Sequence, residues 1–194
     1  MTISGSSDRL YSIAEGQAGY FTSRQAREAG VDRSLLSRQV RTGRLYRVHH
    51  GLYRLVHFPA APDEDLVVAW LQTGPASVIS YDSALALHHL TDALPSEIHV
   101  TVPRAASHRR PGIRLHTNRL APHEITHRNG VAVTTVSRTI ADVAASGLSE
   151  EFVSQAVREA LTNGLSTPEE LLSAARSQRV RDLIRRSLEE ALAP

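Results

Sequence analysis

The sequence predicts an α+β fold in two parts, a small N-terminal unit and a larger unit with a small β-sheet and several helices. Two observations predict it. Residues 20–55 pass from helix-type to strand-type spacing of apolar residues, and residues 58–194 run from helices to strands and back to helices. The closely spaced Pro59 and Pro62 interrupt both patterns between the two parts. We therefore expect domains at residues 1–57 and 58–194.

The N-terminal unit begins with signals for two short helices. Thr22 and Gln25 have the spacing of a capping box, in which each side chain satisfies a backbone N–H group at the helix start. Gly30 is placed to end this helix, because glycine adopts the left-handed conformation without a Cβ penalty. Asp32 is placed to cap a second helix. Two helices joined by a short glycine turn are typical of a helix-turn-helix.

The second helix predicts a DNA-reading face. Leu36 and Val40 can pack on the first helix through Ala26. The other faces carry side chains that suit phosphates and base edges, namely Arg33, Ser34, Ser37, Arg38 and Arg41.

Residues 44–55 predict a β-hairpin after this helix. Two short apolar runs flank Gly51, which can supply the positive φ of the turn. The ribbon is rich in cationic side chains, namely Arg44, Arg47, His49, His50 and Arg54. The whole unit therefore predicts a winged helix-turn-helix, with the hairpin as the wing. The alternative is an ordinary small α+β unit with a solvated basic face.

The charge distribution favours a polyanionic partner for the N-terminal unit. Residues 1–57 hold nine arginines against four acidic residues, net +5, whereas the remainder holds thirteen against sixteen, net −3. All 22 basic residues are arginine. We attribute the use of arginine in place of lysine to coding bias, and we draw conclusions only from the positions of the arginines.

In the larger unit, helices are expected at residues 64–71, 80–90, 137–145, 150–163 and from Pro168, with a last amphipathic helix at 180–193. Alternating residues predict strands at 97–102 and 113–117, and the hairpin signal Asn129-Gly130 joins strands at 125–128 and 131–134. Three or four strands should form the sheet. The arginine-rich stretch 104–114 predicts a mobile connection, with a second basic contact for DNA or an acidic partner as the alternative.

Several classes of function find no support in the sequence. No apolar run approaches the ~18 residues of a membrane span, and the zero cysteine count agrees with a reducing compartment, so we expect a cytoplasmic protein. The familiar catalytic motifs are missing, and no enzyme, cofactor or metal site is predicted. The adjacent His88 and His89 point about 100° apart on a helix, unlike a helical metal pair. The acids Asp63, Glu64 and Asp65 are explained by the dipole of the helix they begin.

Five segments, in order, resemble the AbiEi-type antitoxins of bacterial type IV toxin–antitoxin systems. They are GYFTSRQAREAGVDRSLLSRQVRTGRLYRVHHGLYRL, ISYDSALALHHL, EIHVTVPR, RRPGIRLHTNRL and GVAVTTVSRTIADVA, within about residues 10–165. The resemblance implies a winged helix that binds operator DNA and represses its own operon, and a C-terminal domain that counteracts a nucleotidyltransferase-like toxin. Related chains often continue into a nuclease-like domain, and we expect no nuclease activity from the residues of this sequence.

On the positions that match the winged helix, the resemblance places the DNA contacts at Arg33, Ser34, Ser37, Arg38, Arg41, Arg44, Arg47 and Arg54. It supplies no residues for toxin neutralisation, and direct contact with the toxin stays open. A homodimer on inverted-repeat operator DNA is expected, because one winged helix buries little DNA surface. The alternative function is a stand-alone winged-helix transcriptional regulator with a ligand-binding or dimerisation domain.

Overall fold

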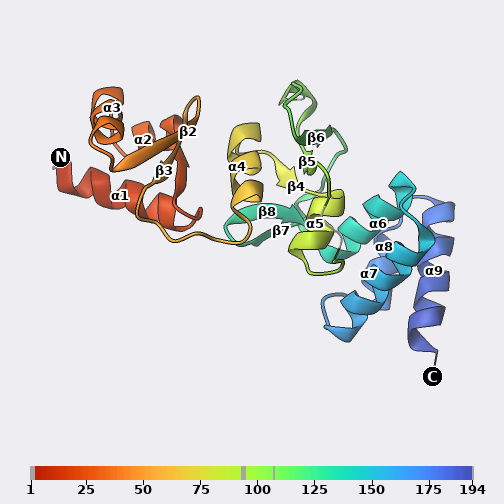
Figure 1. Ribbon diagram of the computed structural model, residues 1–194. Helices are drawn as coiled ribbons and strands as arrows, with labels where there is room; N and C mark the ends of the chain where they lie inside the picture. The colour runs from red at the N-terminus through yellow and green to blue at the C-terminus, as the bar shows by residue number, and fades with distance from the viewer. Residues whose placement is uncertain (1–2, 93–94, 107, 194) are drawn as a thin grey trace. The chain divides into compact units, whose positions relative to one another are not determined.

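The computed structural model describes residues 3–92, 95–106 and 108–193, with the side chains of residues 3 and 4 left out (Figure 1). The chain forms two compact units. The first comprises residues 1–75 with 129–131, and the second comprises residues 76–128 with 132–194. The sequence-based boundary after residue 57 is a statement about which segments fold independently. Compactness does not test independent folding, so this boundary stays a prediction.

The first unit combines four helices with a three-stranded sheet among its described residues. Its sheet has the order β1-β3-β2, and both strand pairs are antiparallel. The elements are α1 (Ile3–Glu15), β1 (Tyr20–Thr22), α2 (Ser23–Glu28), α3 (Arg33–Arg41), β2 (Leu45–His49), β3 (Leu52–Leu55) and α4 (Glu64–Thr73).

The local signals of the helix-turn-helix are confirmed. The Thr22 side chain accepts from the backbone N of Gln25, and the Gln25 side chain accepts from the backbone N of Thr22. Asp32 Oδ1 accepts from Leu35 N at 2.8 Å and so caps α3. Gly30 has φ +87°, and a Cβ there would lie 3.0 Å from the Ser6 hydroxyl of α1. Glycine is therefore favoured by conformation, and a side chain there would crowd Ser6.

Two elements of this unit were not predicted, α1 and β1. α1 contributes Leu10 and Ala14 to the same apolar core as Ala26, Leu36 and Leu45. β1 is only three residues long, and it is a strand because it pairs with β3, Phe21 lying opposite Tyr53 in the register. The rings of these two residues stack at 5.8 Å. A strand this short has no period of its own in the sequence.

The second unit contains a five-stranded sheet and a group of helices. The strand order is β6-β5-β4-β8-β7, in which β5 and β6 are parallel, as are β4 and β8, while β4 and β5 are antiparallel. Its strands are β4 (Val78–Ile79), β5 (Ile98–Thr101), β6 (Ile113–His116), β7 (Ile125–Arg128) and β8 (Val131–Thr134). Its helices are α5 (Tyr81–Leu87), α6 (Val136–Ser146), α7 (Glu150–Thr162), α8 (Pro168–Ala174) and α9 (Gln178–Leu192), with the 3₁₀ turns Arg104–Ala106 and Pro122–Glu124.

The predicted α+β class is confirmed, and one count changes. The hairpin β7–β8 has the predicted bounds, with Asn129 and Gly130 both at positive φ. The expectation of three or four strands is wrong, because the two-residue β4 joins the described sheet at its centre. The connection 104–114 contains the first 3₁₀ turn and a bridge between Arg110 and Ile113, and its Ser107 lies outside the described residues.

The core of the second unit lies among its helices. Figure 1 shows α6, α7, α8 and α9 gathered at the C-terminal end of the chain. Ile140, Val157, Leu171 and Ile184, one from each helix, have no exposed surface. The apolar residues that predicted these helices therefore pack against one another in a common core.

Candidate nucleic-acid interface

Helix α3 presents a polar face to solvent. At 3.6 residues per turn its arginine and serine side chains fall within an arc of about 140°, on the opposite side from the buried Leu36. All five are exposed, as a recognition helix requires: Arg33, Ser34, Ser37, Arg38 and Arg41. The structure thus brings the five residues predicted for this helix onto one accessible surface.

The start of this face is fixed by its cap. The Ser34 hydroxyl donates to Asp32 Oδ1 at 2.7 Å, beside the bond from Leu35 N. The hydrogen bond from the Leu35 backbone, followed by that from Ser34, lowers the pKa of Asp32. Because its proton is engaged, the Ser34 hydroxyl offers a ligand its oxygen as an acceptor.

The wing adds exposed cations beside α3. Arg44 precedes β2 and is exposed, and Arg47 lies within β2 with its Nη2 atom 3.0 Å from His50 Nδ1 at the hairpin turn. Tyr46 lies between them and is 62% exposed. Leu45, at the start of the strand, is buried, and both Tyr46 and Arg47 are exposed. A ribbon with this pattern can meet a phosphate backbone with cations and one aromatic ring.

Arg54 differs from the other predicted contacts. Its side chain is 18% exposed and its Nη2 atom lies 2.8 Å from Glu64 Oε1. Seven of the eight predicted residues therefore lie on an open surface, and the eighth is engaged within the unit. Glu64 was interpreted from the sequence as a helix-dipole residue, and nothing in the local sequence indicates its pairing with a residue ten positions earlier.

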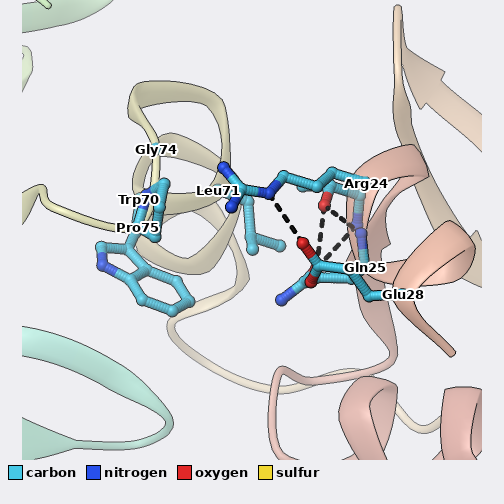
Figure 2. A pocket seen from close by; sticks show the side chains of 8 residues that line it. Arg24, Gln25, Glu28, Trp70, Leu71, Gly74 and Pro75 are labelled. Atoms are coloured by element: carbon cyan, nitrogen blue, oxygen red, sulfur yellow. Dashed lines mark hydrogen bonds and ion pairs between the residues drawn. The ribbon is translucent and has the colours of Figure 1, made fainter.

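Helix α4 also lies close to α2 in the first unit. A pocket of about 170 Å³ is bordered by Arg24, Gln25 and Glu28 on one side and by Trp70 and Leu71 on the other (Figure 2). Arg24 and Glu28 form an exposed ion pair of 2.8 Å at its rim. The capping box of α2 forms another part of the lining, through Thr22 and Gln25. The helix that follows the wing therefore faces α2 of the helix-turn-helix across this pocket.

Buried polar groups of the second unit form a separate cluster. His99 Nδ1 lies 3.1 Å from Asp82 Oδ2, and the His116 ring stacks on Tyr81 with 3.8 Å between centroids. Burial, followed by the nearby His99 and Arg114, lowers the pKa of His116 to about 4. His88 is also buried, and its Nε2 atom lies 2.8 Å from the carbonyl oxygen of Thr134. Within the described ranges, no group of three acidic or histidine side chains has the geometry to hold a metal ion.

The His116 pKa predicts acid sensitivity. Between pH 6.5 and about pH 4 the His116 side chain binds a proton in the unfolded chain but not in the folded chain. The free energy of unfolding therefore falls as the pH is lowered through this interval. Between pH 7 and pH 5 the free energy of unfolding of a His116→Phe variant should fall by about 1 kcal/mol less than that of the wild type. This figure includes a discount for the partial solvent exposure of the side chain. Urea unfolding at both pH values measures this. The exposed His127→Phe variant is the control, and equal pH dependence in all three proteins would refute the assignment.

These observations define the class of the first unit. A capped helix pair, a glycine turn and an antiparallel hairpin with arginines form a winged helix-turn-helix. Residues 8–56 match the model of a family described as "Transcriptional regulator, AbiEi antitoxin". The AbiEi-type resemblance is thus confirmed over these residues. The description of this family is that of a transcriptional regulator.

The fold has a counterpart among solved structures. The crystal structure of the RV2827C protein from Mycobacterium tuberculosis is similar over 97% of this chain and 78% of that chain, with a TM-score of 0.57. The sequence identity is 15%, so this likeness concerns the fold. No curated protein matches the chain. Among the described residues, no helix has the length and apolar character to cross a membrane.

Proposed function

We propose that this chain is a cytoplasmic DNA-binding antitoxin that represses its own operon and counteracts a cognate nucleotidyltransferase-type toxin. The observation that most supports this proposal is the exposed polar face of α3, beside the exposed arginines of the wing. Both lie within the residues that match the AbiEi antitoxin regulators. The proposed DNA contacts include Arg33, Ser34, Ser37 and Arg38 for base edges. Arg41, Arg44 and Arg47 are proposed for phosphates.

Different side chains are proposed to supply the affinity and the sequence specificity of DNA binding. Arginines on phosphates release counterions and supply much of the affinity, whereas side chains at the start of α3 distinguish base edges. Two copies on inverted repeats give enough contact for a useful operator, because a single winged helix buries little DNA surface. The second unit, with its own core, is proposed to carry the antitoxin activity.

Salt-titrated binding tests the repressor half. The purified chain should bind the DNA upstream of its own gene more tightly than scrambled DNA of equal length. The logarithm of its affinity should fall with the logarithm of salt concentration by about 0.9 per phosphate contacted, thus by about 3 or more per protomer. Fluorescence anisotropy measures both quantities. Equal binding to both DNAs, or none, would refute operator recognition.

Co-expression tests the antitoxin half. A nucleotidyltransferase encoded beside this gene should arrest growth alone, and this chain should restore growth. A variant with alanine at Arg33 and Arg38 should still restore growth, because the second unit carries this activity in the proposal. Failure of the wild-type chain to protect would leave a stand-alone regulator as the function.

A further inference from the structure

The Arg54 side chain donates hydrogen bonds inside the first unit. Its Nη2 atom lies 2.8 Å from Glu64 Oε1, 3.1 Å from the carbonyl oxygen of Phe58 and 3.3 Å from that of Pro59. The guanidinium carbon lies 5.4 Å from the centre of the Tyr20 ring, a cation–π contact. Its Nε atom is buried. The guanidinium is therefore surrounded by protein groups on several sides.

Glu64 is held as firmly as its partner. As the first residue of α4 it accepts from the Ala61 backbone N at 3.0 Å and from the Tyr20 hydroxyl at 2.7 Å, in addition to Arg54. Burial opposes its charge, but the hydrogen bonds from Tyr20, Arg54 and Ala61 outweigh burial and lower the pKa of Glu64. The carboxylate is thus ionised at neutral pH and needs its cationic partner.

We infer that Arg54 is a positioning residue, which with Tyr20 and Glu64 fastens the wing strand β3 to the start of α4 and acts on DNA only through the wing. We call these three residues the Arg54 cluster. The inference rests on the proposed function for its effect on DNA. To reach a phosphate, Arg54 would have to leave Glu64 without a cation in a half-buried place, which is costly.

The cluster also fixes the segment between the wing and α4. Phe58, Pro59 and Ala61 supply backbone groups to Arg54 or Glu64, so a proline-rich stretch without helix or strand is held at three points. At the other end of α4, Trp70 and Leu71 border the pocket beside α2 (Figure 2). The first turn of α4 is therefore fastened to β3 through Arg54 and Glu64, and the other end of α4 faces α2 across the pocket.

A double-mutant cycle on the full chain separates positioning from contact. We would compare Arg54→Ala, Glu64→Ala and the double variant with wild type on the upstream DNA over a range of salt concentrations. In the positioning role, each single variant binds about tenfold more weakly, and the double variant binds no more weakly than the singles. The salt slope of all three stays at the wild-type value, because no phosphate contact is lost.

The contact role predicts a different pattern. Arg54→Ala would then lower the salt slope by about 1, and Glu64→Ala would leave binding unchanged or tighter by releasing the arginine. That result would overturn the inference. Arg44→Ala is the internal reference, since an exposed wing arginine on a phosphate should lower the slope by about 1.

A milder pair of variants keeps the test valid if the alanine variants unfold. Tyr20→Phe removes only the hydroxyl bond to Glu64 and should weaken binding about threefold without a change in salt slope. Tyr53→Phe on the same sheet keeps its ring stacked on Phe21 and should bind like wild type. Equal binding by Tyr20→Phe and Tyr53→Phe would count against the cluster.

Thermal unfolding distinguishes failure of this inference from failure of the proposed function. If the wild-type chain binds no DNA, the proposed function fails, but the Tm values of the same cycle still report the cluster. If the double variant loses less in Tm than the two single variants lose in sum, Arg54 and Glu64 are coupled. Strictly additive losses overturn the inference.

Discussion

An Arg33→Ala, Arg38→Ala double variant is expected to lose specific operator binding by about 100-fold or more. Both side chains are exposed on the polar face of α3, where each can donate two hydrogen bonds to a base edge. Each such contact is worth about 1–3 kcal/mol, so under the proposed function the loss of both should remove most discrimination between operator and scrambled DNA. Anisotropy titrations on both DNAs at one salt concentration measure the loss.

The control for this variant removes the same charge elsewhere. Arg179 and Arg181 are exposed near the start of α9 in the second unit. Their double alanine variant should bind operator DNA as wild type does. If the two double variants weaken binding alike, net charge and not the α3 face governs binding. If the α3 variant weakens operator and scrambled DNA equally, Arg33 and Arg38 contact phosphates and not bases.

Replacing Arg138 with methionine is expected to destabilise the second unit by about 3–5 kcal/mol. The arginine side chain is 2% exposed and its guanidinium pairs with Glu124 at 2.8 Å and Asp142 at 2.9 Å. Methionine fills much of the same volume but leaves two acidic groups without their buried cation, which is the costly way to break an ion pair. Urea unfolding followed by circular dichroism measures the change.

Arg176→Met is the matched control. Arg176 also pairs with Glu124 at 2.8 Å, but its side chain is 56% exposed. Solvent screens this pair, so the control should lose at most about 1 kcal/mol. Equal losses in the two variants would show that burial does not set the strength of this network.

The same network illustrates why pKa directions need the structure. Glu124 has its pKa lowered, because hydrogen bonds from the Ala121 backbone and Arg138 outweigh the effect of burial. Asp142 shares Arg138 with it, but burial dominates there and raises its pKa. Both are ordinary acids in sequence, and neither was singled out as part of a buried network.

The sequence by itself determined the elements whose signals are local. The capping box at Thr22, the glycine turn at Gly30, the Asp32 cap and the hairpin at Asn129-Gly130 were all predicted and are all present. Each depends on backbone geometry within four residues, so neighbouring side chains suffice to specify it. The exposed face of α3 follows in the same way, because helical period and one apolar stripe decide which residues point outward.

Only the tertiary structure decided the features that join distant segments. β1 and β4 are strands because they pair with others, and two or three residues are too few to carry a period. Tyr20 meets Glu64 across 44 positions, and the ion pair of that same Glu64 with Arg54 separates Arg54 from the other predicted DNA-binding residues. In sequence Arg54 is one more wing arginine. Its role depends on which acid the folded chain places beside it, and no local pattern records that choice.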